Sequence, residues 1–176
     1  MNSKKQVGKI PSEKECLEML ARNKVPENIV RHSVKVKEFA VELAQKMVAK
    51  GIKVNLGLVR AGALLHDLDK IETLGSKKMH GTLAWEKLNG EGCYAVAEIA
   101  RKHLIENVGG LSSWEEKLVY YADKRVIDET VVPLNERLDF IKQKYGLKDK
   151  KLMAKIRESE KAILALEKSI LETINK

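Results

Sequence analysis

Apolar residues recur three and four positions apart along most of the chain, and this spacing is typical of helices that bury one face. In the segment 27–50, the predicted buried face consists of Val36, Ala40, Leu43 and Met47. Runs in which apolar and polar residues alternate, as they do in strands, are few. The pattern therefore predicts an all-α fold.

Breaks rich in glycine, proline and asparagine separate the predicted helices. Ser12 could cap the first of them. Consecutive serines at 112 and 113, each followed three residues later by a glutamate, offer two alternative capping boxes. We expect the segment 71–79 to be a loop. The expected helices cover residues 12–23, 27–50, 55–69, 80–88, 93–106, 112–126 and 133–145.

The last predicted helix begins at about Asp149 and carries Ile156, Ile163 and Ile170 seven residues apart. An amphipathic stripe of this kind must pack against another apolar surface. It could lie on its own domain or form a homodimer with a second copy. We therefore expect a compact multi-helix domain over residues 1–146 and a C-terminal helical extension over 147–176.

Composition agrees with a folded domain, since 44% of the residues are hydrophobic and 33% are charged. No apolar run is long enough to span a bilayer, and none follows the N-terminal lysines, so a cytoplasmic protein without a membrane partner is expected.

The net charge of +8 arises mostly after residue 141. Basic charge can attract nucleotides or nucleic acid, but lysine and glutamate mixed on a solvated helix give the same composition, and we favour that explanation. Nucleic acid is therefore not the expected partner.

Several ionisable residues lie on or beside the predicted apolar faces of four different helices: His32, His66, His103 and Asp123. A single histidine in such a place is more often a hydrogen-bonded core residue than a ligand. Four such groups together, with Asp67 next to His66, favour another interpretation, because buried ionisable groups are costly unless they are paired or bind a metal. A cation bound by imidazoles and carboxylates would satisfy the whole cluster.

The segments that contain these residues resemble the HD-domain phosphohydrolases in order and spacing over residues 27–130. They read HSVKVKEFA, AGALLHDLDK, MHGTLAWEKL, ARKHL and VYYADKRV. A bare His-Asp dipeptide is weak evidence, whereas the ordered pattern H…HD…H…H…D on a helical background is specific. The resemblance implies that the ligands are His32, His66, Asp67, His80, His103 and Asp123, the six-ligand pattern of the HDIG type.

The resemblance also implies how these residues divide between two metals. His32, His66 and Asp123 would hold the first metal, and His80 and His103 the second, with Asp67 bridging the two. We expect two divalent transition metal ions, with iron or manganese favoured and nickel, cobalt, zinc or magnesium as alternatives. The metals would activate a hydroxide and polarise a phosphoryl oxygen.

Four further residues have candidate supporting roles. Lys70, one turn after His66, is interpreted as a contact to phosphate or as a partner of a metal ligand, and an exposed helix-end lysine is an equally weighted alternative. Either Lys124 or Arg125 could bind a phosphate, since arginine does so with two hydrogen bonds. Asp69 could orient His66 or a metal-bound water, but we favour an ordinary acid at the C-terminal end of a helix.

The leading functional hypothesis is hydrolysis of a phosphoester or phosphoanhydride in a nucleotide or a similar phosphorylated small molecule. A mixed-valence di-iron oxygenase is the alternative, because some HD-fold proteins with a similar ligand set carry out that chemistry. A module that binds nucleotide or RNA through the basic C-terminal helix is a third and less favoured hypothesis.

Overall fold

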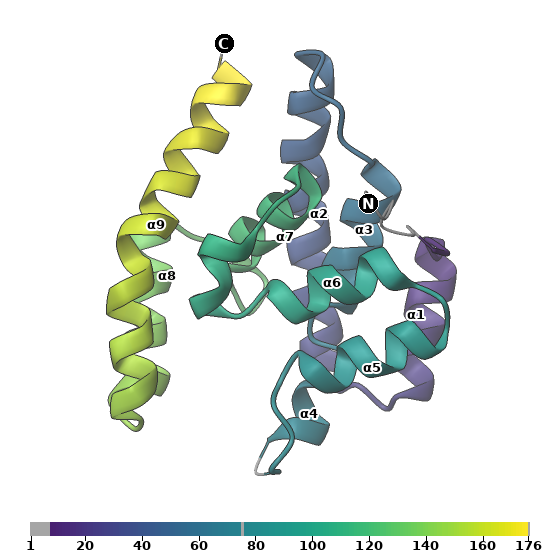
Figure 1. Cartoon of the computed structure of the whole chain (residues 1–176), viewed down its shortest axis with the longest axis horizontal. Coiled ribbons are helices and arrows are strands. Elements are labelled where there is room, and N and C mark those ends of the chain that lie inside the picture. Colours follow the sequence, from purple (N-terminus) through teal and green to yellow (C-terminus); the bar gives the residue numbers. More distant parts are fainter. Residues whose placement is uncertain (1–7, 75, 176) are drawn as a thin grey trace, which may run out of the picture.

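The computed structural model describes residues 8–74 and 76–175 and confirms the expected all-α architecture with a long C-terminal helix (Figure 1). Most of the N-terminal segment without an apolar run, and Gly75 of the expected loop, lie outside the described residues. The elements, in chain order, are α1 (Glu13–Arg22), α2 (Glu27–Ala49), α3 (Leu56–Leu65), α4 (Lys70–Thr73), α5 (Thr82–Gly90), α6 (Tyr94–Lys102), η1 (Ile105–Gly110), α7 (Trp114–Asp123), β1 (Val126–Ile127), β2 (Thr130–Val131), α8 (Leu134–Ile141), η2 (Lys142–Gly146) and α9 (Lys150–Asn175).

Helix starts follow the capping residues of the sequence. The Ser12 hydroxyl accepts from the backbone N–H of Glu15, whose carboxylate accepts from the backbone N–H of Ser12, so α1 begins with a capping box. At α7, the Ser113 hydroxyl accepts from the backbone N–H of Glu116, but the Glu116 carboxylate accepts from Ser112 instead. Neither of the two predicted boxes is therefore complete at α7.

The centre of the fold is α2, which packs against α3 and α7, while α5 and α6 pack against each other beside it (Figure 1). The buried apolar residues form two clusters. The larger cluster joins α2, α3 and α7 to the C-terminal helices, and the smaller one lies among α1, α3, α5 and α6. The helix ends that approach one another between these clusters carry the candidate ligands.

Helices α3 and α6 approach closely because Gly62 has no side chain. A Cβ atom at Gly62 would lie 2.7 Å from the Cδ1 atom of Ile99, which is too close for any side chain. Since both helices end a few residues further along, this contact brings their C-terminal residues, His66 and His103, close together.

Several predicted boundaries are wrong, because tertiary contacts set them rather than the apolar pattern. The helix expected at 55–69 ends at Leu65, and the helix expected at 93–106 ends at Lys102. The expected loop 71–79 contains most of the short helix α4. The strands β1 and β2 were not predicted; they form an antiparallel hairpin in which Val126 pairs with Val131. Its turn includes Asp128 in the left-handed region, with φ of 52°.

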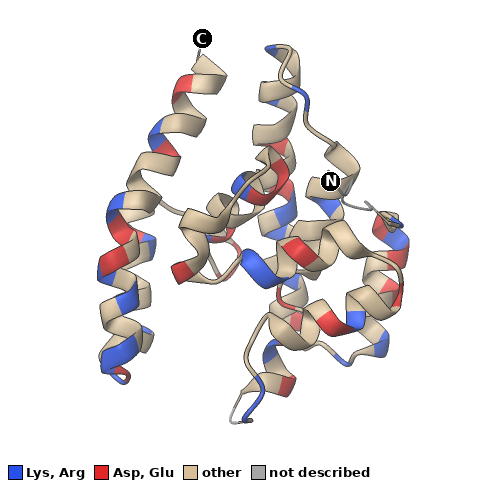
Figure 2. Ribbon diagram, in the orientation of Figure 1, with Lys and Arg blue, Asp and Glu red and all other residues tan. Residues whose placement is uncertain are grey.

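The C-terminal helix α9 packs on its own chain, against η1, η2 and α7 among others. The predicted stripe of Ile156, Ile163 and Ile170 is fully buried in the larger apolar cluster, so these three side chains are covered without a second copy. Lysine, arginine and glutamate are mixed along the rest of α9 (Figure 2). In residues 8–74 and 76–175, no helix, α9 included, is both long and apolar enough to cross a membrane.

The packing of α9 predicts a contrast between neighbouring residues. Ile163→Ala should lower the free energy of unfolding by about 2–5 kcal/mol, because it leaves a cavity in the core. Leu164→Ala, at a residue that is 47% exposed, is the matched control and should change it by about 0.5 kcal/mol or less. Urea denaturation followed by circular dichroism measures both. Equal effects of the two variants would contradict the docking of α9 on the core.

Candidate metal centre

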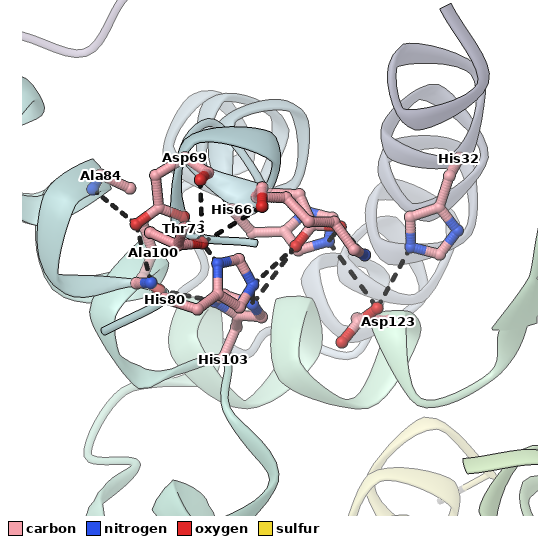
Figure 3. A network of polar contacts seen from close by, with 12 residues as sticks. His32, His66, Asp69, Thr73, His80, Ala84, Ala100, His103 and Asp123 are labelled. Atoms are coloured by element: carbon pink, nitrogen blue, oxygen red, sulfur yellow. Dashed lines mark hydrogen bonds and ion pairs between the residues drawn. The ribbon is translucent and has the colours of Figure 1, made fainter. Parts of the chain in front are cut away.

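The six candidate ligands converge where four helices meet. His66 and His103 directly follow the last residues of α3 and α6, and Asp123 is the last residue of α7. His32 lies near the start of α2. Figure 3 shows His32 and Asp123 on one side of His66 and the rings of His80 and His103 on the other.

The first group of ligands consists of His32, His66 and Asp123, all of them buried. The Nε2 atom of His32 lies 3.2 Å from Oδ1 of Asp123, and the Nε2 atom of His66 lies 3.7 Å from the same oxygen. These three donor atoms all lie within 4.8 Å of one another. They are therefore close enough together to coordinate one ion.

The second group consists of Asp67, His80 and His103. The Nε2 atoms of His80 and His103 lie 3.1 Å and 3.5 Å from Oδ1 of Asp67, and 3.1 Å from each other. The other oxygen of Asp67, Oδ2, lies 3.5 Å from Nε2 of His66, which belongs to the first group. Each carboxylate oxygen of Asp67 thus faces one group, as a bridging ligand requires.

All four imidazole rings are held in the same way. Each Nδ1 atom lies 2.6–3.0 Å from an oxygen that can only accept, so Nδ1 must carry the proton. The acceptors of His32, His66, His80 and His103 are the carbonyls of Asp128 and Ala63, a carboxylate oxygen of Asp69, and the carbonyl of Ala100. In a neutral ring, Nε2 then points a lone pair at the other ligands.

These facing nitrogen and carboxylate atoms need positive charge between them, which either protons or a metal can supply. The Nε2 atom of His66 is buried and has no hydrogen-bond partner among the described residues. The Nε2 atoms of His80 and His103 cannot bond to each other if both rings are neutral. A divalent cation in each group would satisfy these nitrogens and the carboxylates together, so the residues present fit a metal.

Neighbouring charges keep the carboxylates ionised. Burial alone would raise the pKa of Asp67, but His66 and Lys70 hold that pKa well below its usual value. Burial lowers the pKa of the His103 imidazole to about 4, so this ring is neutral at pH 7. The carboxylates of Asp67 and Asp69 outweigh burial and raise the pKa of His80 to about 9, so without a metal this ring holds a second proton. A metal would displace that proton, because an anionic carboxylate and a neutral imidazole are the forms that bind metal.

Comparison with known proteins identifies the family. A family model of the HD domain matches residues 29–128. The chain belongs to the HD-domain family. An HD-domain chain was the expectation from the motifs, and the match confirms it; the match does not distinguish the six-ligand subgroup.

Two curated relatives also match this HD-domain chain. An uncharacterised protein of Methanocaldococcus jannaschii is 34% identical over 68% of this chain and 82% of its own length. A tRNA (cytidine(56)-2'-O)-methyltransferase of Thermoplasma volcanium is 30% identical over 82% of this chain but only 45% of its own length. The chain therefore spans less than half of the second relative. No solved structure matches it.

The preferred interpretation of Asp69 as an ordinary helix-end acid is wrong. The Asp69 side chain is fully buried, and its Oδ1 accepts from Nδ1 of His80 at 2.7 Å. Its Oδ2 accepts from the backbone N–H groups of Gly81 and Ala84 at 2.8 Å and 2.9 Å. Asp69 thus fixes the His80 ring to the start of α5 in the HD domain. No sequence signal pointed to this contact, because it joins residues eleven positions apart across α4 and the loop that follows it.

The structure places two of the predicted cations beside the ligands. The Lys70 ammonium lies 2.5 Å from Oδ2 of Asp67. The Lys124 side chain is buried, and its ammonium donates to Oδ2 of Asp123 at 2.5 Å and to the carbonyl of His103 at 2.8 Å. The Lys124 ammonium therefore contacts one residue of each ligand group, Asp123 of the first and His103 of the second.

The structure does not bring Arg125 to the ligands. Its guanidinium donates to the carbonyl of Val132 and the hydroxyl of Tyr121, and it lies 3.3 Å from Glu167 of α9. The arginine that does approach the ligands is Arg137 of α8, whose Nη2 atom lies 3.9 Å from Oδ1 of Asp123. Sequence reasoning missed Arg137, because it lies beyond the family motifs.

The contacts of Asp69 predict a selective loss of metal affinity. An amide at this position has one acceptor oxygen instead of two, so Asp69→Asn cannot hold His80 and both N–H groups. The variant should bind metal at the second group about 10–100-fold more weakly, with the first group unchanged. Competition titration with a chelating dye measures both affinities. Asp139→Asn, at an exposed acid of α8, is the control. An equal loss at both groups would contradict the assignment.

Proposed function

We propose that the protein is a metal-dependent phosphohydrolase that cleaves a phosphoester or phosphoanhydride of a nucleotide or a similar small molecule. The observation that carries this proposal is the arrangement of Asp67 between two groups of ligands whose Nε2 atoms all face inward. Membership of the HD-domain family supports the same chemistry.

The proposal includes two divalent transition metal ions. Imidazole nitrogens mixed with carboxylate oxygens suit iron and manganese, and also nickel, cobalt or zinc, better than calcium. When bound, such ions lower the pKa of a coordinated water and neutralise charge on phosphoryl oxygens. Iron and manganese are the favoured pair by resemblance, and the other metals remain candidates.

The residues of the chain itself contribute position and charge. The Nδ1 acceptors fix the direction of each ring, so that all four Nε2 atoms are in place before a ligand arrives. Lys124 holds the carboxylate of Asp123. The Lys70 side chain is 35% exposed and lies against Asp67, so its ammonium is available to a phosphoryl oxygen of a substrate at the edge of the centre.

Three other functions were weighed against hydrolysis: oxygenase chemistry, tRNA methylation and RNA binding. A di-iron oxygenase would use a similar ligand set, and it would consume oxygen when loaded with iron. The name of the Thermoplasma relative concerns tRNA methylation, but the chain spans only 45% of that protein, so we do not propose that activity here. Lysine and arginine are mixed with glutamate along α9, as on an ordinary solvated helix (Figure 2), so we do not propose RNA binding.

The bridging position of Asp67 predicts the effect of its removal. Asp67→Asn should lower metal-dependent phosphoester hydrolysis by more than about 100-fold, since changes to residues that merely support a ligand already cost 10–100-fold. Helical content should be retained, because an amide fills nearly the same volume. A panel of nucleotides and bis(p-nitrophenyl) phosphate, assayed with manganese or iron, measures the activity.

Asp139→Asn serves as the control for that assay and should keep the activity of the unaltered protein. Treatment with a chelator should abolish hydrolysis, and added metal should restore it. Full activity of Asp67→Asn, or hydrolysis that survives removal of the metal, would refute the proposed centre. Oxygen uptake by the iron-loaded protein without any phosphatase activity would favour the oxygenase.

A further inference from the structure

One arginine faces the metal centre from outside the segment that matches the family. Arg137 lies on α8, beyond residues 29–128. Within α8, Leu134, Leu138 and Ile141 are buried in the core. This register also turns Arg137, three residues after Leu134, toward the core side of the helix. Its Nη2 atom reaches to 3.9 Å from Oδ1 of Asp123.

The guanidinium of Arg137 lacks a hydrogen-bond partner among the described residues, and its Nε atom is buried. Its side chain is 12% exposed, and Nε is buried with no partner. No hydrogen bond joins the guanidinium to any other residue in the described part of the chain, and it stacks on the ring of Phe140 at 5.4 Å. An unsatisfied buried donor with a full charge is costly, so this arrangement points to a missing acceptor.

Asp123 is not that acceptor. A separation of 3.9 Å is beyond hydrogen-bond distance. The Asp123 carboxylate already accepts from the Lys124 ammonium at 2.5 Å, and its Oδ1 faces Nε2 of His32 at 3.2 Å. Arg137 is therefore beside the first ligand group without being part of its hydrogen bonding.

The other cations near the ligands have their partners within the chain. Lys70 contacts Asp67, and Lys124 contacts Asp123 and the carbonyl of His103. Arg125 donates to residues of the hairpin and α7 and does not face the ligands. Among these described cations, Arg137 alone has no hydrogen-bond acceptor.

We propose that Arg137 binds an oxygen of the substrate's phosphoryl group beside the first ligand group, His32, His66 and Asp123. The inference rests on the proposed function and names the residue that recognises the phosphate. A guanidinium donates two parallel hydrogen bonds to a tetrahedral oxyanion, which matches an arginine whose donors are free and which stacks on an aromatic ring. The segment after the family motifs thus supplies part of the substrate site.

The test is calorimetric binding of inorganic phosphate to the manganese-loaded full-length protein. Arg137→Met removes the charge and keeps the length of the apolar stem, and Arg137→Lys keeps the charge without the paired donors. Arg157→Met, on the exposed side of α9, is the control for loss of one positive charge. Elemental analysis of each variant measures its metal content.

Phosphate should bind at least tenfold more weakly to Arg137→Met, with Arg137→Lys intermediate and Arg157→Met within twofold of the unaltered protein. Metal content should be equal in all of them. Unchanged phosphate affinity in Arg137→Met, or an equal loss in Arg157→Met, would overturn the proposal. Loss of metal from Arg137→Met would instead assign Arg137 to the support of Asp123 and would also overturn it.

The same measurements distinguish failure of the hydrolase proposal from failure of the Arg137 proposal. If the unaltered metal-loaded protein binds phosphate through Arg137 but hydrolyses no phosphoester, the hydrolase proposal fails and the phosphate site stands. If the unaltered protein hydrolyses phosphoesters and Arg137→Met binds phosphate normally, the hydrolase stands and the phosphate site fails. If the unaltered protein binds no phosphate, the Arg137 proposal fails whatever the activity.

Discussion

Six ligand side chains, five of them buried and His80 partly exposed, face one another at the meeting point of four helices, and the geometry of the site depends on how their charges are balanced. Each imidazole donates its Nδ1 proton to a fixed acceptor, so its Nε2 atom faces the carboxylates of Asp67 and Asp123 or another imidazole. Without a metal, protons would have to lie between these atoms, as the raised pKa values of His66 and His80 indicate. A metal in each group would take the place of those protons and satisfy the nitrogens and carboxylates together.

The fold keeps the ligands in register through contacts that lie outside the centre. The close approach of α3 and α6 at Gly62 sets the distance between His66 and His103. The hairpin turn presents the carbonyl of Asp128 to His32. Asp69 ties His80 to the start of α5. The ligand rings therefore need little rearrangement when a metal binds, which is the benefit of preorganised supporting contacts.

The apolar spacing was sufficient to predict an all-α chain and to place His32, His66, His103 and Asp123 toward the interior, because helix periodicity is a local property. The motifs were sufficient to predict the HD-domain family. Asp69, Arg137 and the hairpin could not be predicted in this way, because their roles come from contacts between segments far apart in sequence. Arg125 shows the converse: it lies only two residues after Asp123, just beyond the end of α7, yet its side chain points away from the ligands, toward Tyr121 and Val132.

The central claim is that one chain holds two metal ions that share Asp67. Its most direct test is the stoichiometry of the protein after chelator treatment, reloading with manganese or iron, and removal of free metal. Elemental analysis should then give two ions per chain. Saturation at one ion per chain, or no retained metal, would contradict the account.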